Sequence, residues 1–171
     1  CNAAETLLVH ADVAATYLPA AARALWDKDT VLHADPAAHR ILTEAATTAG
    51  RDDLLTQATE ADWDTEYGSL DLAVRVVKSL EEAIDHIRAH TTGHTEAVLA
   101  QDVSVINDFI AGMDSAAIMV NASTRFTDGG QLGLGAELGI STQKLHARGP
   151  MGLSELTTTT WIVEGDGHIR P

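Results

Sequence analysis

The sequence contains a single cysteine, Cys1, and few aromatic residues: two Phe, two Tyr and three Trp among 171 residues. One cysteine cannot form an internal disulfide, which is typical of proteins in a reducing cytosol. No apolar run approaches the eighteen residues of a membrane span, and no charged segment followed by an apolar one opens the chain as a secretion signal does. We therefore expect a cytoplasmic protein without a membrane partner.

Basic residues are scarce as well. Lys and Arg total 11 against 25 Asp and Glu, which gives a formal net charge of −14. Proteins that bind nucleic acids need a basic face for the phosphate backbone, so this balance argues against DNA or RNA as a partner. The acidic residues are expected on a solvated surface. The length is sufficient for one domain with a hydrophobic core.

Apolar segments of two kinds alternate along the chain. Short apolar runs predict buried strands at residues 6–10, 31–34, 72–77, 97–100 and 116–120. Apolar residues at helical spacing, preceded by capping residues, predict helices over residues 12–26, 36–49, 80–90 and 103–112. Alternating strands and helices with short connections indicate an α/β fold, a layered parallel sheet with helices on both faces.

Several details of these elements are also predicted. The buried face of the first helix is expected at every fourth residue, namely Val13, Tyr17, Ala21 and Leu25. Pro19 is expected to kink or restart that helix. Residues 51–64 are polar and irregular. The fourth helix is expected to bury Val103, Ile106, Phe109 and Ile110.

The end of the chain has two further elements. Residues 136–147 are expected to form a short helix. Residues 156–163 (LTTTTWIV) are rich in β-branched side chains and predict a strand, set apart by Gly149-Pro150 and Gly152.

A glycine-rich stretch runs from Val120 to Gly152. Five glycines lie between Gly129 and Gly139, and Arg125 and Asp128 stand just ahead of them. Glycine permits positive φ and a close approach of the backbone. The stretch is therefore predicted to surround a bound molecule.

This stretch and four other segments resemble γ-glutamyl phosphate reductase, also called glutamate-5-semialdehyde dehydrogenase, a branch of the aldehyde dehydrogenase superfamily. The other segments are residues 1–10 (CNAAETLLVH), residues 65–67 (TEY), the run 77–87 and His94-Thr95-Glu96. They occur in the family's order and nearly span the chain. The resemblance implies the catalytic-domain fold of aldehyde dehydrogenases.

The resemblance also implies a reaction, the NADPH-dependent reduction of L-glutamate 5-phosphate to L-glutamate 5-semialdehyde and phosphate in proline synthesis. Alone, a Cys at the start of a chain is more often incidental. By resemblance, Cys1 is the nucleophile, with Asn2 beside it at the catalytic site. Its thiolate would attack the acyl phosphate, release phosphate and leave a thioester for NADPH to reduce, with backbone N–H donors at the oxyanion. Glu66 would hydrogen-bond the ribose of the nicotinamide nucleotide.

The resemblance further places this sequence in the C-terminal portion of the enzyme. Residues 1–154 would form the catalytic domain, and residues 155–171 an arm that pairs with a neighbouring subunit in a homo-oligomer. The half that binds most of the NADP would precede Cys1. We therefore expect the isolated chain not to turn over.

Arg125 is the only Lys or Arg between Arg88 and Lys144. A guanidinium can hold a carboxylate through two parallel hydrogen bonds, so we predict that Arg125, with Asn121 and Ser123, binds the small-molecule substrate. A surface arginine neutralised by an acidic neighbour is an equal alternative. Lys144 and a second basic residue, Arg148, are expected to be structural.

Two motifs are weighed and set aside. His86, His90 and His94 are spaced by four, as on a metal-binding helix, but Thr91-Thr92-Gly93 is expected to end the helix before His94, and we predict no metal. Residues 133–139 (GLGAELG) resemble a dinucleotide-binding motif, but the last spacing is one residue too long. Two other functions stay open: an aldehyde dehydrogenase with another substrate, and a non-catalytic assembly domain that uses the last strand.

Overall fold

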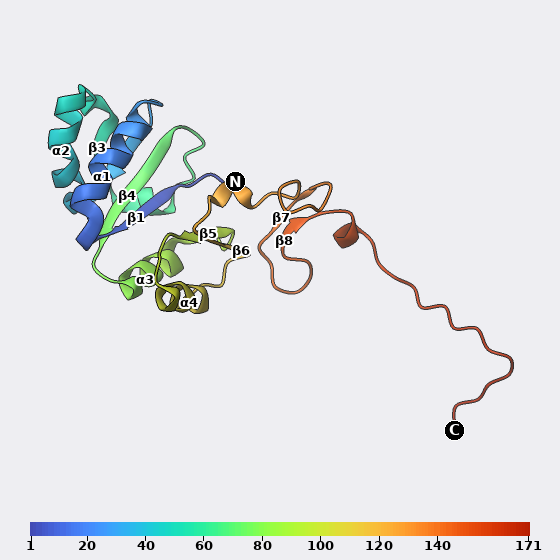
Figure 1. Cartoon of the computed structure of the whole chain (residues 1–171). Helices are drawn as coiled ribbons and strands as arrows, with labels where there is room; N and C mark the ends of the chain where they lie inside the picture. Colours follow the sequence, from blue (N-terminus) through green and yellow to red (C-terminus); the bar gives the residue numbers. More distant parts are fainter.

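A four-stranded parallel sheet is the largest sheet of the computed structural model, which describes residues 1–171 (Figure 1). Its strands are β1 (Thr6–His10), β2 (Val31–Ala34), β3 (Leu55–Gln57) and β4 (Asp71–Val77). They lie in the order β1-β4-β2-β3, and every neighbouring pair is parallel. The strands β4 and β2 are therefore interior, and β1 pairs with residues 73–77 of β4.

Two helices, α1 (Ala11–Trp26) and α2 (Pro36–Ala49), cover one face of this sheet. One cluster of thirteen buried residues joins them to the strands and includes Leu18, Trp26, Leu42 and Val74. The buried indole of Trp26 donates from Nε1 to the carbonyl of Leu54 at 3.3 Å, so its polar atom is satisfied. This cluster is the hydrophobic core.

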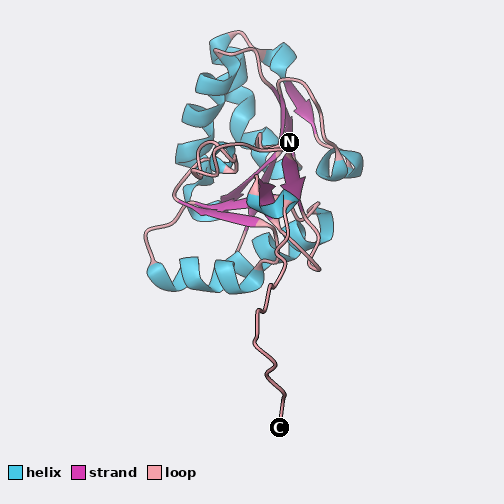
Figure 2. Cartoon of the chain, turned by 90° about the vertical axis from the view of Figure 1, so that its right-hand side faces the viewer, coloured by secondary structure: helices cyan, strands magenta, loops and turns pink.

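The opposite face is covered by the 3₁₀ helix η2 (Glu60–Asp64) and by α3 (Leu80–His90). Successive residues of a strand point to opposite faces. On β4, Val74 belongs to the core, whereas Arg75 lies beside His86 of α3, with 3.4 Å between Nη1 and Nδ1. Figure 2 shows the strands between upper and lower groups of helices. The predicted α/β fold with helices on both faces is confirmed.

Two smaller sheets follow. The strands β5 (Thr95–Val98) and β6 (Ala117–Val120) pair in parallel, with α4 (Val103–Gly112) between them in sequence. The strands β7 (Gly139–Ser141) and β8 (Gly149–Met151) form an antiparallel pair. The parallel strands are thus divided between a four-stranded and a two-stranded sheet.

The ends of α2, α3 and α4 follow the capping residues predicted from the sequence, whereas α1 begins one residue earlier than predicted, with His10 as its N-cap. The carboxylate of Asp35 accepts from the amide of Ala38 at 2.7 Å at the start of α2, and Gly50 ends that helix with φ +63°. The hydroxyl of Ser79 caps α3, and Asp102 caps α4. The helix α3 ends at His90, as expected.

The predicted buried face of α1 is wrong by one position. Val13 is 49% exposed and Tyr17 is 43% exposed, whereas the buried residues are Ala14, Leu18, Ala22 and Trp26. The predicted set and the buried set both recur every four residues. In the buried set, Leu18 and Trp26 fill the core, and the small Ala14 and Ala22 allow α1 to lie close to α2. Pro19 lies inside α1 without interrupting it. Packing on both sides of Pro19 outweighs the cost of a proline in a helix, about 3 kcal/mol.

Three other predictions are corrected. The stretch 51–64 contains β3, which is only three residues long and therefore lacks a clear period. Residues 136–147 contain β7 instead of a helix, because glycine disfavours a helix and β8 provides a partner strand. On α4, only Phe109 is buried, while Val103 and Ile110 are 67% and 42% exposed.

No strand forms at residues 156–163. The chain makes a 3₁₀ turn, η4 (Ser154–Leu156), and residues 157–171 then run away from the body without regular structure (Figure 1). Trp161 and Val163 are 91% and 89% exposed. A strand needs partners for its backbone N–H and C=O groups, and no other strand of the chain lies beside this segment. None of the helices has the length and apolarity needed to cross a membrane.

Candidate active site

The first residues of the chain are held against the start of the glycine-rich stretch. The side-chain amide of Asn2 donates to the carbonyls of Thr127 at 3.0 Å and Arg125 at 3.3 Å. The hydroxyl of Thr124 donates to the carbonyl of Asn2 at 2.7 Å. Figure 1 shows the N-terminus beside this orange segment. Cys1 therefore lies beside the start of the glycine-rich stretch.

A cavity of about 740 Å³ opens beside Cys1. Its wall includes Asn2, Ser123, Thr124 and two carboxyl groups, those of Glu5 and Glu96. No lysine or arginine lines it. Cys1 is exposed, and its thiol makes no hydrogen bond in the chain. A small molecule in this cavity would meet a free thiol among acidic and neutral groups.

The residues His94 and Thr95, at the start of β5, form one wall of the cavity. The hydroxyl of Thr95 donates to the hydroxyl of Thr127 at 2.9 Å, and the Nδ1 atom of His94 lies 2.7 Å from the same Thr95 oxygen. Thr127 is completely buried. The Nε2 atom of His94 is buried without a hydrogen-bond partner. Burial lowers the pKa of His94, so its imidazole is neutral at pH 7.

Two carboxyl groups in the cavity are displaced in the opposite direction. Burial raises the pKa of Glu96, although Oε1 accepts hydrogen bonds from Thr91 and, at 3.0 Å, from Ser115. Burial, and then the nearby carboxylate of Glu66, raises the pKa of Glu5. Both groups therefore hold protons more strongly than ordinary glutamates do.

Glu66 itself is exposed, does not line the cavity and makes no hydrogen bond. Its carboxylate acts to raise the pKa of two residues of the cavity wall, Glu5 and His94. The loop that carries it is fixed by Tyr67, whose hydroxyl donates to Asp62 at 2.9 Å. The Tyr67 ring also stacks on the ring of His33, with 4.9 Å between the centroids.

The three residues predicted to bind substrate lie in one row after β6 but have different surroundings. Ser123 lines the cavity. The side chain of Asn121 makes two hydrogen bonds of 2.9 Å, one to the amide and one to the carbonyl of Ala100, and so joins the ends of β5 and β6. Arg125 is exposed and outside the cavity wall.

The other histidines of the spaced set have structural partners. His86 packs edge-on against Trp63, with 5.2 Å between ring centroids, and burial lowers its pKa to about 4. His90 lies 2.8 Å from Asp64. No group of three or more His, Cys, Asp or Glu side chains is arranged to hold a metal ion.

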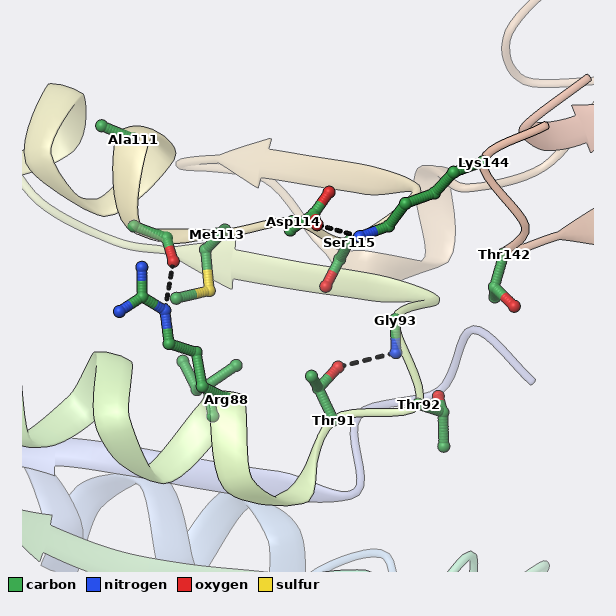
Figure 3. Close-up of a pocket in the computed structure, with 12 residues that line it drawn as sticks. Arg88, Thr91, Thr92, Gly93, Ala111, Met113, Asp114, Ser115, Thr142 and Lys144 are labelled. Carbon is green, nitrogen blue, oxygen red and sulfur yellow. Dashed lines mark hydrogen bonds and ion pairs between the residues drawn. The ribbon is translucent and has the colours of Figure 1, made fainter. Parts of the chain in front are cut away.

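A second cavity, of about 710 Å³, lies where the end of α3 meets the end of α4 (Figure 3). Arg88 joins the two helices, donating from Nε to the carbonyl of Gly112 at 2.8 Å. Lys144 and Arg148 both pair with Asp114, and the hydrogen bond from Lys144 is the main reason that the pKa of Asp114 is lowered. Both basic residues thus have a partner within the chain, in agreement with the structural role expected for them.

Sequence reasoning missed two residues of the site, Glu5 and Thr127. Glu5 stands in the segment that carries Cys1, but nothing in its spacing shows that it faces a cavity. Thr127 looks like a loop residue in the sequence. Its burial and its contacts with Asn2 and Thr95 exist only after folding.

No family model matches the chain. Proteins named γ-glutamyl phosphate reductase match it closely. The one from Bifidobacterium adolescentis is 56% identical over 170 residues, 99% of this chain and 39% of that protein. The one from Kineococcus radiotolerans is 58% identical over 171 residues, 99% of this chain and 38% of that protein.

Solved structures agree with these matches. A crystal structure of γ-glutamyl phosphate reductase from Thermotoga maritima has a TM-score of 0.88 and 46% identity, over 100% of this chain and 39% of that one. The structure of the same-named protein from Saccharomyces cerevisiae has a TM-score of 0.58 and 27% identity, over 75% and 31%. The chain spans about two fifths of the length of its curated relatives. In sequence and in fold, the chain is similar to about two fifths of the length of proteins named γ-glutamyl phosphate reductase.

Proposed function

We propose that this chain is the C-terminal catalytic portion of an NADPH-dependent reductase that converts L-glutamate 5-phosphate to L-glutamate 5-semialdehyde and phosphate in proline synthesis. The observation that carries the proposal is the position of Cys1. Its free thiol lies at the cavity, and Asn2 holds the segment against the glycine-rich stretch. The chain is also more than half identical to a protein named γ-glutamyl phosphate reductase. Residues 1–154 would form the catalytic domain.

Cys1 would act as the nucleophile. Its sulfur bonds to the acyl carbon, the bond from that carbon to the phosphate oxygen breaks, and a thioester remains. The exposure of the thiol leaves room for the substrate. Asn2 would hold Cys1 in place, since its amide is occupied by two backbone carbonyls.

The nicotinamide nucleotide, when bound, supplies the hydride that reduces the thioester. Glu66 has the properties of a ribose contact, because its carboxylate is exposed and has no partner within the chain. The stacked pair of Tyr67 and His33 would keep its loop in position. Most contacts to NADP would come from a nucleotide-binding half outside this chain.

Substrate contacts are proposed for Ser123, on the cavity wall, and for Arg125, whose exposed guanidinium can turn toward a carboxylate. Asn121 would serve the site by holding the ends of β5 and β6 together.

The test compares this chain with a longer one that includes the nucleotide-binding half. The assay follows NADPH formation from glutamate semialdehyde, phosphate and NADP. We expect turnover only in the longer protein, and near-equal rates would contradict the domain assignment. In the longer protein, Cys1→Ala should leave no more than about 1% of the rate, because the covalent path is lost. The same assay is run with simple aldehydes in place of glutamate semialdehyde. Equal rates with the two kinds of substrate would favour the alternative, an aldehyde dehydrogenase with another substrate.

Residues 157–171 suggest an additional role in assembly. We propose that this exposed segment, which includes Trp161 and Ile162, pairs as a strand with a second copy of the protein. Light scattering over a range of concentrations should show association that disappears when the residues after Leu153 are removed. A monomer with the segment intact would contradict this role.

A further inference from the structure

One polar atom beside the candidate nucleophile lacks a partner. The Nε2 atom of His94 is buried and makes no hydrogen bond, while nearly all other buried side-chain polar atoms are satisfied. An unsatisfied buried polar group costs about 1–3 kcal/mol. Such an atom calls for an explanation, because a donor that reached it would recover this energy.

The contacts of the opposite ring nitrogen fix the tautomer of His94. The single hydroxyl proton of Thr95 is donated to Thr127 at 2.9 Å, so the Thr95 oxygen is an acceptor toward Nδ1 of His94, at 2.7 Å. The proton of the neutral imidazole is therefore on Nδ1, and Nε2 carries a lone pair. Because Thr127 is completely buried, this arrangement is held firmly.

The same residue, Thr127, connects His94 to Cys1. Its hydroxyl accepts from Thr95, the neighbour of His94, and its carbonyl accepts from Asn2, the neighbour of Cys1. Both Cys1 and His94 line the one cavity. The thiol of Cys1 makes no hydrogen bond that would prevent it from turning toward Nε2 of His94. Hydrogen bonds between catalytic groups are often long until a ligand is bound.

We propose that Nε2 of His94 accepts the thiol proton of Cys1 when the sulfur attacks the substrate. The inference deepens the proposed function and rests on it. The S–H bond breaks and the proton passes to Nε2. The new S–C bond forms, the C–O bond to phosphate breaks with its electron pair on phosphate, and the departing phosphate takes the proton from His94.

The surroundings of His94 suit this role. Its lowered pKa keeps the resting imidazole neutral and able to accept. The carboxylates of Glu137 and Glu66 favour the imidazolium that forms. Glu5 and Glu96 are the other charged groups of the cavity. Thr95 is then a positioning residue, which orients the ring without touching the reacting atoms.

The experiment measures alkylation of Cys1 by iodoacetamide in the 171-residue chain, followed by mass spectrometry from about pH 6 to pH 9, around the ordinary thiol pKa of about 8.5. His94→Gln should slow alkylation below pH 8 about tenfold, less than the 10²–10⁴-fold that a positioned base contributes in a catalysed reaction. Thr95→Val should slow it as well, and Thr95→Ser should restore it. The matched control is His90→Gln, because His90 lines the same cavity but is bound to Asp64.

Equal pH profiles for wild type and His94→Gln would overturn the inference, and so would equal slowing by His90→Gln. If circular dichroism shows that His94→Gln fails to fold, the Thr95→Val and Thr95→Ser pair decides, since both keep the imidazole. The amino group of Cys1 is present in every variant of the 171-residue chain, so its effect on the alkylation rate cancels in each comparison. Alkylation requires no cofactor or second half, so its outcome is independent of the reductase assay that tests the proposed function.

Discussion

The imidazole of His86 governs how the stability of this protein changes with pH in mildly acidic solution. The residue is 8% exposed, packs against Trp63 and lies 3.4 Å from a guanidinium nitrogen of Arg75. Burial, and then the charge of Arg75, lowers its pKa from 6.5 to about 4, while Asp64 and Glu82 act weakly in the opposite direction. Between these two values the unfolded chain binds the proton and the folded chain does not.

The sign and size of the effect follow directly. Because the unfolded state binds more protons in this window, the free energy of unfolding falls as the pH falls from 6.5 to about 4. At 1.36 kcal/mol for each tenfold change in proton affinity, the loss is about 3 kcal/mol. That is a large fraction of the roughly 5–15 kcal/mol that stabilises a typical domain.

The assay is urea unfolding followed by tryptophan fluorescence at several pH values between about 7 and 4, spanning the window from the ordinary histidine pKa. The carboxyl groups of Glu5 and Glu96 have raised pKa values, so their protonation favours the folded state as the pH falls. The comparison with His86→Gln removes their contribution. We expect the stability of wild type, measured relative to His86→Gln, to decrease by about 3 kcal/mol over this range.

The control variant is His168→Gln, because His168 is exposed near the end of the chain. Its pH profile should run parallel to that of wild type. A stability difference between wild type and His86→Gln that does not change with pH would refute the reasoning.

Three further predictions concern the fold. In urea unfolding, Leu18→Ala should lower the free energy of unfolding by about 2–5 kcal/mol because Leu18 is buried in the core. Val13→Ala, on the exposed face of α1, should change it by no more than about 0.5 kcal/mol. Equal losses for the two variants would contradict the assignment of the buried face of α1. Gly50→Ala should cost about 1–2 kcal/mol because φ is +63° with space around it, and a stabilised variant in thermal unfolding would contradict the left-handed cap. Asn121→Ala should cost about 1–3 kcal/mol through its bonds to Ala100, and unchanged stability with reduced substrate affinity would instead support a direct substrate contact.

Local signals in the sequence were sufficient for most element ends. The α2 helix begins at Pro36 after Asp35 and ends at Ala49 before Gly50, as predicted, because an N-cap and a C-terminal glycine act within a few residues of the helix. The strands β1 and β2 match their predicted limits for a similar reason. Each is a short apolar run between polar residues, so the polar residues on either side mark where the buried strand ends.

The candidate site was predictable only in outline. The resemblance named Cys1 and the glycine-rich stretch, and folding does bring them together through Asn2. The sequence did not distinguish Ser123 on the cavity wall from Asn121, whose side chain is occupied by Ala100, because both are polar loop residues. Burial and hydrogen-bond partners across more than a hundred residues have no local signature.

The sequence by itself determined the alternation of strands and helices, most of the capped helix ends and the resemblance to γ-glutamyl phosphate reductase, since each depends on residue identity over short spans. Tertiary structure alone decided which stripe of α1 is buried, whether residues 156–163 find a partner strand, and which residues surround Cys1. In each of these cases the sequence permits two arrangements of similar local energy. Packing and hydrogen bonds between distant segments select one of them.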